Sequence, residues 1–171
     1  PLPLAEVQAH LRPDTALIGW LDVNWKDSPD RWGFVVRHEG PVRWCRLQGE
    51  EAVLRRWQEQ ASATGSVNIG RLGYETRIQP LLPHLDGATH LLVIPSGRLI
   101  GVAVESFEPE PGTYLDDRFT ISYVPSGTIH AWLCARAEAT DTDRTAAPAL
   151  ESITNAAGAS SNRNARRGST E

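Results

Sequence analysis

A histidine and a cysteine, His130 and Cys134, lie four residues apart in the segment SGTIHAWLCARAE. In a helix this spacing places two side chains on one face, with their Cβ atoms about 5–6 Å apart. An imidazole beside a thiol can produce a cysteine nucleophile, which also needs an oxyanion site and an electropositive setting. The surrounding sequence supplies neither. We therefore expect the pair to pack on the flank of a helix, beside an apolar stripe of Ile129, Trp132, Leu133 and Ala137.

Other residues that could bind a ligand have simpler structural explanations. Cys45 shares a strand face with Leu47 while Trp44 points the other way, so a buried or edge thiol is expected. The segment IPSGRLIG lacks the glycine spacing and the lysine of a P-loop. An acidic connection lacks the glycine and terminal glutamate of an EF-hand. Its residues are Asp22, Asn24, Asp27 and Asp30. We expect no catalytic, cofactor-binding or metal-binding residue among all these side chains.

The composition is that of a globular protein with no nucleic-acid partner. The chain has 171 residues, of which 40% are hydrophobic and 22% are charged, enough for one domain of ordinary size. Its net charge is -4, and its basic residues are scattered except in NRNARR. A surface that follows phosphates needs a basic stripe, and none is present. The six tryptophans are expected to pack between elements, not to form a ligand cage.

The cysteine content and the hydropathy favour a cytoplasmic location. Two cysteines do not make a disulfide framework, and separate thiols suit a reducing compartment. No apolar run approaches the roughly 20 residues that span a bilayer, and the first residues do not resemble a signal peptide. The chain contains no methionine, so we expect that it begins inside a longer polypeptide or after processing.

The first half of the chain predicts a helix, three strands and a second helix. Apolar residues at helical spacing indicate a short helix over residues 4–11. The segments TALIGWLDV, RWGFVVRH and PVRWCRL are typical of strands, and turn residues between them predict an antiparallel meander. Residues 24–30 are expected to form the loop between the first two strands. The pattern then becomes helical over residues 50–63.

The second half predicts buried strands separated by helices. Residues 72–85 indicate a helix that Pro80 and Pro83 bend or break. The run at 91–94 is typical of a central strand, and the following PSG turn leads to a short second strand at 98–100. FTISYVP predicts another strand, after which Ser126 caps the helix that holds His130 and Cys134. Residues 139–171 carry too few large apolar side chains to fold and are expected to be disordered.

Two motifs resemble the N-terminal half of the CHAT domain, a caspase-like family often attached to tetratricopeptide repeats. They are VIPSGRLIG and YLDDRFTISYVPSGT, and the resemblance extends over roughly residues 4–137. One position departs from the family pattern, because Ala103 stands where CHAT sequences usually have proline. The resemblance implies a partial caspase-like three-layer α/β/α sandwich over residues 1–138, with a mixed sheet that starts with the antiparallel meander.

The resemblance also implies the chemistry of a cysteine peptidase. In the family a histidine in a His-Gly turn and a cysteine at the end of the next strand follow the YVPSGT helix. Here the polar residues 139–171 follow, with neither residue type, so no catalytic residue is assigned. We expect either an inactive fragment of a CHAT-domain protein or a non-catalytic interaction module beside upstream helical repeats. A third alternative is an unrelated α/β binding domain. The expected partner is a protein or a peptide substrate, with no cofactor and no membrane.

Overall fold

The computed structural model describes residues 2–25, 28–47, 68–96 and 99–146, with side chains at all of them except 23–30 and 141–146. Contacts divide the chain into two units, Pro1–Leu133 and Cys134–Glu171. The first unit holds the sheet and the shorter helices. In the second unit the structure describes the continuation of one helix. The predicted helix at 50–63 lies outside the described residues.

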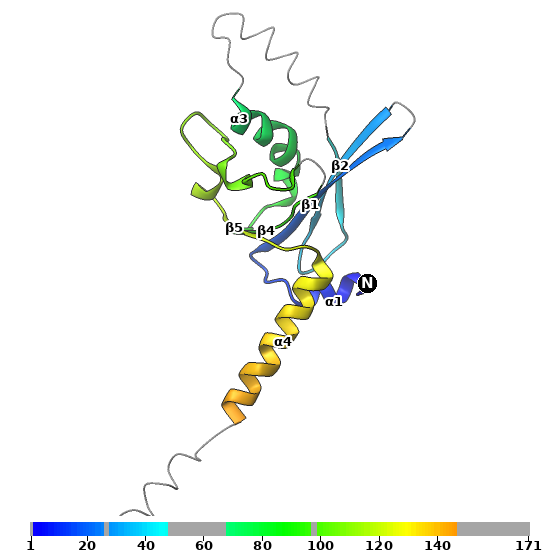
Figure 1. The fold of residues 1–171 in the computed structure, drawn as a ribbon, viewed down its shortest axis with the longest axis vertical. Coiled ribbons are helices and arrows are strands. Elements are labelled where there is room, and N and C mark those ends of the chain that lie inside the picture. The colour runs from blue at the N-terminus through cyan, green and yellow to red at the C-terminus, as the bar shows by residue number, and fades with distance from the viewer. Residues whose placement is uncertain (1, 26–27, 48–67, 97–98, 147–171) are drawn as a thin grey trace, which may run out of the picture. The chain divides into compact units, whose positions relative to one another are not determined.

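The first unit is built on a mixed five-stranded sheet with the order β3-β2-β1-β4-β5 (Figure 1). β1 pairs antiparallel with β2, which pairs antiparallel with β3, and this confirms the predicted meander. On the other side β1 pairs parallel with β4, which pairs parallel with β5. The strands are β1 (Thr15–Trp25), β2 (Ser28–Val36), β3 (Arg43–Arg46), β4 (His90–Ile94) and β5 (Thr120–Tyr123).

Helical segments cover both faces of this sheet. On one face a continuous helical run begins with α3 (Ile69–Gly73), widens to a π-helix in η1 (Tyr74–Ile78) and tightens to a 3-10 helix in η2 (Gln79–His84). Two short 3-10 segments, η4 (Val104–Ser106) and η5 (Leu115–Asp117), lie on the same face of the sheet. The other face is covered by α1 (Leu4–Ala9) and the first turn of α4 (Gly127–Ala146). The chain is thus an α/β fold, as the sequence predicts.

The two faces bury apolar clusters of different size. The larger cluster joins the strands to the helical run and to residues 99–119, and Ile18, Leu81 and Leu91 are fully buried in it. The smaller cluster packs Val7 and Leu11 against β1, β2 and β4. The alternation of side chains along each strand explains this division, because successive residues face opposite sides.

Two local predictions are wrong. Residues 24–30 do not form a long loop, since β1 and β2 continue until Trp25 pairs with Ser28. The short segment after the PSG turn is not a strand: Leu99 is buried in the larger cluster, and the backbone turns at Gly101, whose φ is +79°. Because the Leu99 side chain enters the core and the backbone reverses at Gly101, the described residues of this segment do not pair with the sheet.

The apolar stripe predicted for α4 is largely exposed. Ile129 and Trp132 are 41% and 55% exposed, whereas Ala131 is 1% exposed. The packed face of the helix carries small residues such as Gly127 and Ala131. At Gly127 even a Cβ atom would be too close to α1, because it would lie 2.9 Å from the Val7 side chain. Small residues let the helix approach α1 more closely than the large apolar residues would. α4 also continues to Ala146, so residues 139–146 are helical, and the rest of the expected tail lies outside the described residues.

Candidate interaction site

The His130 and Cys134 pair lies on α4, as expected, and its chemistry does not favour a nucleophile. Nε2 of His130 donates a hydrogen bond to the carbonyl oxygen of His10 over 3.2 Å, so this nitrogen is not available to accept a proton. Burial, together with the charge of Glu138, raises the pKa of the Cys134 thiol. Because the thiolate is the reactive form, both effects work against thiol catalysis.

Cys45 lies on the edge strand β3 and is partly buried, where the sequence predicts a buried or edge thiol. It packs against the larger apolar cluster together with Leu47. Trp44 faces the other side, where its ring lies 5.4 Å from that of Phe34. Burial raises the pKa of the Cys45 thiol, so this cysteine is also unsuited to act as a nucleophile.

Among the acidic residues that were compared with an EF-hand loop, Asp22 is the one whose side chain the structure describes, and it forms an ion pair. Asp22 pairs with Arg77, with 2.9 Å between the Arg77 Nη1 and the Asp22 Oδ1. The backbone of Asn24 belongs to β1 and that of Asp30 to β2, while Asp27 lies outside the described residues. No group of three or more His, Cys, Asp or Glu side chains placed to hold a metal ion occurs in the described ranges.

The tryptophans whose side chains the structure describes differ in exposure. Trp20 is 2% exposed, whereas Trp44 and Trp132 are each more than half exposed, so packing in the core does not explain every one of them. In IPSGRLIG, residues 97 and 98 lie outside the described ranges, and the Ser96 hydroxyl donates to the carbonyl oxygen of Trp20. Through this hydrogen bond, the described part of the segment helps to hold the end of β4 beside β1.

The outer side of β5 presents an unpaired strand. Thr120 and Val124 donate backbone hydrogen bonds to β4 and its flank, so residues 120, 122 and 124 face β4. By the two-residue alternation of a parallel ladder, the N–H and C=O groups of Ile121 and Tyr123 point away from the sheet. No strand within the described residues pairs with this side. Four backbone hydrogen-bonding groups are thus presented along one edge.

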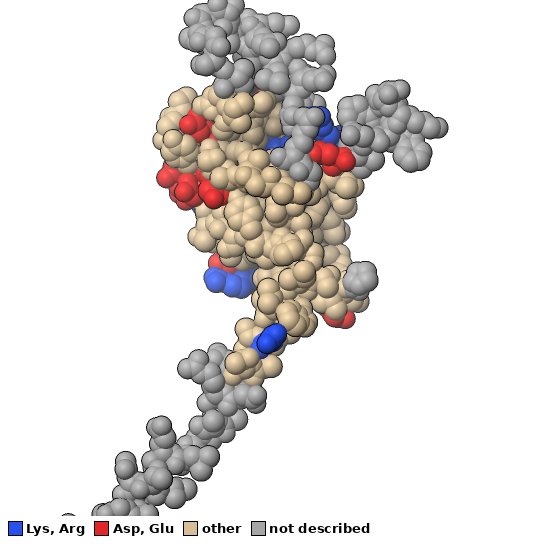
Figure 2. Space-filling model, viewed as in Figure 1, with Lys and Arg blue, Asp and Glu red and all other residues tan. Residues whose placement is uncertain are grey.

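The two edges of the sheet differ in charge. At β3, Arg43 and Arg46 occupy two of the four strand positions. Charged side chains on an edge strand are one way in which proteins prevent pairing with other chains. β5 has the sequence TISY, with no charge and no proline, and Figure 2 shows few charged side chains over β4 and β5 on the face seen there. The β5 edge therefore lacks the protection that the β3 edge has.

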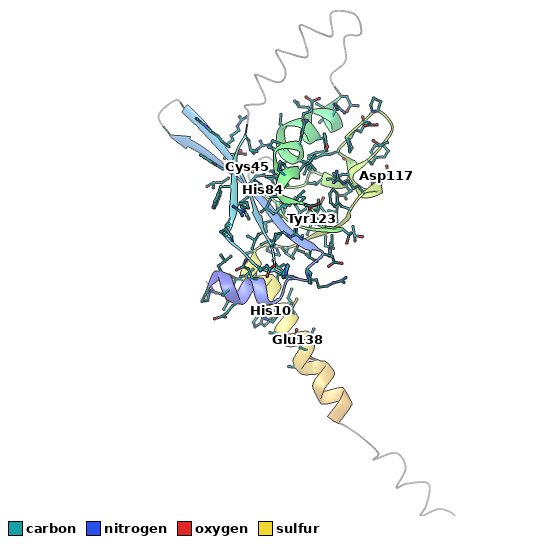
Figure 3. All side chains as sticks on the ribbon, turned by 180° about the vertical axis from the view of Figure 1, so that it is seen from behind. His10, Cys45, His84, Asp117, Tyr123 and Glu138 are labelled. Atoms are coloured by element: carbon teal, nitrogen blue, oxygen red, sulfur yellow. The ribbon has the colours of Figure 1, made fainter. Side chains whose placement is uncertain are left out.

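The position of Tyr123 at the end of β5 is fixed by its hydroxyl group. This group accepts a hydrogen bond from the backbone N–H of Val104 over 2.8 Å and donates one to Glu105. Burial and the hydrogen bond to Glu105 raise the pKa of Tyr123 to about 12, so the phenol stays protonated at neutral pH. The strand is held from the η4 side, and Figure 3 shows Tyr123 from behind the view of Figure 1.

The sequence predicts the strand at β5 but not its position at the edge. Strand order depends on which segments pair, and the β1–β4 pairing joins residues far apart in the chain. The useful signal was the absence of charge and proline in TISY.

None of the helices in the described ranges has the length and apolar content that crossing a bilayer requires. No protein-family model and no curated protein sequence matches this chain.

Proposed function

We propose that this chain is a non-catalytic protein-interaction module that accepts an extended segment of a partner protein as a sixth strand beside β5. The observation that carries the proposal is the neutral, unpaired outer side of β5, with the backbone groups of Ile121 and Tyr123 directed outward. Adding a strand to an open sheet edge is a common mode of peptide recognition, in which the main chain gives affinity and the side chains give specificity.

The neighbouring helix supports this proposal. α4 begins four residues after β5 ends, and its first turns expose Ile129, Trp132 and Leu133. Large apolar side chains gathered on a surface favour contact with another protein. A partner segment that pairs with β5 would have an apolar surface on the same unit to contact. The raised pKa values of both thiols argue against peptidase chemistry by these residues.

The experiment selects peptides from a displayed random library on the immobilised chain and measures their binding by biolayer interferometry. We expect enriched sequences that alternate apolar and polar residues over four to six positions, as a strand does. Thr120 is exposed and lies at the start of β5. Thr120→Lys should weaken binding about tenfold, because a lysine there guards the edge. On peptide binding, the Ile121 and Tyr123 amides should exchange with solvent more slowly.

The matched control adds the same charge away from the edge. Ile100 is 70% exposed in a turn, so Ile100→Lys should leave peptide binding unchanged. Far-UV circular dichroism would verify that both variants fold. Selection of no peptide, or equal weakening by both lysines, would show that the β5 edge is not a recognition site.

A second candidate function is that of the front part of a CHAT-like, caspase-type cysteine peptidase domain. The φ angle of Ala103 is -74°, within the range that a proline imposes, so the backbone is compatible with the residue usual in that family. In this candidate the next parallel strands would join at β5. Translating the coding DNA beyond Glu171 in three frames tests it: a strand ending in His-Gly, followed by one ending in Cys, would support it. A stop codon in all frames would oppose it.

A further inference from the structure

A pocket of about 280 Å³ lies at the opposite side of the sheet from β5, where the connection between β2 and β3 approaches the end of η2. Its lining includes Arg37 after β2, Arg43 on β3 and His84 at the end of η2. Two carboxylates, Glu39 and Asp86, also border it. Figure 3 labels His84, one of these lining residues, in the view from behind. Two arginines and a histidine therefore line the same pocket.

Arg37 is fixed in this lining by neutral partners. Its Nη1 donates to the carbonyl oxygen of Asp86 over 2.8 Å, and its Nη2 donates to that of Pro13 over 2.7 Å. Its Nε is buried without a hydrogen-bond partner. These carbonyl groups hold the guanidinium in position but do not cancel its charge. Arg37 thus contributes an oriented positive charge to the pocket.

Arg43 and His84 are available to a ligand. Neither side chain forms a hydrogen bond or an ion pair within the described ranges. Arg43 stands opposite Val35 in the pairing of β2 with β3, so it extends from the sheet face that η2 covers. Of the two carboxylates, Glu39 lies 3.6 Å from Nε2 of His38. The carboxylate of Asp86 is left to accept a hydrogen bond from a ligand in the pocket.

We propose that this pocket binds a small solute that carries an oxyanion, either a carboxylate or a phosphate group. Arg43 and His84 would donate hydrogen bonds to the oxyanion, and Arg37 would supply fixed positive charge behind them. Guanidinium groups match the planar fork of a carboxylate and the oxygens of a phosphate, and charge-assisted hydrogen bonds of this kind are stronger than neutral ones. The carboxylate of Asp86 favours a solute that also carries a hydroxyl or amino donor.

The experiment follows backbone amide NMR signals while inorganic phosphate or succinate is added in a buffer that contains neither. Binding should shift the signals of Gly40 and His84, which line the pocket. Arg43→Gln should raise the dissociation constant about tenfold, because it removes charge-assisted donors. The matched control is Arg46→Gln, which removes an equal charge from the same strand outside the pocket lining and should change the constant less than twofold.

Each outcome decides the proposal. Saturable shifts with either probe that depend on Arg43 support it, and the probe that binds distinguishes a phosphate from a carboxylate. Equal weakening by Arg43→Gln and Arg46→Gln would mean diffuse attraction to surface charge and would overturn it. The absence of shifts at Gly40 and His84 with both probes would overturn it as well. Peptide binding at β5 should be unaffected by Arg43→Gln, so the two proposals can fail separately.

Discussion

At the residue scale, the pair of Asp22 and Arg77 places a permanent charge almost wholly inside the protein. The Arg77 side chain is 3% exposed, and that of Asp22 is 21% exposed. Nε1 of Trp20 donates to the backbone carbonyl of Arg77 over 3.0 Å, which holds η1 against β1. The charge is tolerated because a carboxylate lies within hydrogen-bond distance. Removing the carboxylate would leave a buried guanidinium without that compensation.

We therefore predict that Asp22→Asn lowers the free energy of unfolding by about 3 kcal/mol. The measurement is urea denaturation followed by circular dichroism. The control breaks an exposed pair: Arg12 Nη2 lies 2.7 Å from Asp14, and the Arg12 side chain is 76% exposed. Arg12→Gln should cost about 0.5 kcal/mol or less, because water screens an exposed ion pair. Equal losses in the two variants would contradict the importance assigned to burial.

Residue types alone could not reveal these contacts. Asp22 and Arg77 are separated by 55 residues, and nothing in their local sequences links them. The same holds for Arg37 and His84, which meet only because η2 covers the end of β2 and β3. By contrast, the packing of Cys45 on the same strand face as Leu47 was predictable, because it depends only on the two-residue alternation of a strand. Local patterns determine local environments, while long-range pairs require the fold.

At the element scale, two prolines explain why the helical run on the larger cluster does not continue as an α-helix through η2. Pro80 stands in the first positions of η2, and Pro83 lies inside it. Proline removes a donor and clashes with the preceding turn, so a regular α-helix cannot continue through these residues. The sequence predicted a helix bent or broken there, and the structure confirms that. It did not predict the π-helical turn of η1, which places Thr76, Arg77 and Ile78 in the interior.

The start of α4 provides a prediction about one hydrogen bond. The Ser126 hydroxyl accepts a hydrogen bond from the backbone N–H of Ile129 over 3.2 Å, as expected of a helix cap. Ser126→Ala should lower the free energy of unfolding by about 1 kcal/mol, measured by urea denaturation. Ser126→Asp should retain most of the stability, because aspartate caps equally well. If alanine and aspartate behaved alike, the hydroxyl would not be acting as a cap.

At the scale of the whole first unit, the sheet separates two cores of unequal size. Among the residues that the structure describes, the large cluster includes fifteen buried residues and the small cluster six. Alternation along the strands was visible in the sequence, as in the opposite faces of Trp44 and Cys45. Which face would carry the larger core was not visible, because it depends on where the helical run and residues 99–119 fold back.

Two adjacent leucines on β4 test this asymmetry. Leu91 is buried in the large cluster and Leu92 in the small one, on opposite faces of the same strand. We predict that Leu91→Ala lowers the free energy of unfolding by about 3–4 kcal/mol and Leu92→Ala by about 2–3 kcal/mol. Chemical denaturation of both variants gives the comparison. A larger loss for Leu92→Ala would mean that the small cluster contributes more stability than its size indicates.

The parallel pairing of β1 with β4 has a consequence for how the chain folds. Trp25 and Ser28 meet across a two-residue connection, whereas Thr15 must find His90 about 75 residues later. Closing a long loop costs entropy before its contacts form, and a high contact order slows folding. At 5–20 residues per second, a ribosome needs roughly 4–15 s to synthesise that interval. We therefore expect the β1–β2 hairpin to form first during translation and to keep one side of β1 unpaired until β4 emerges.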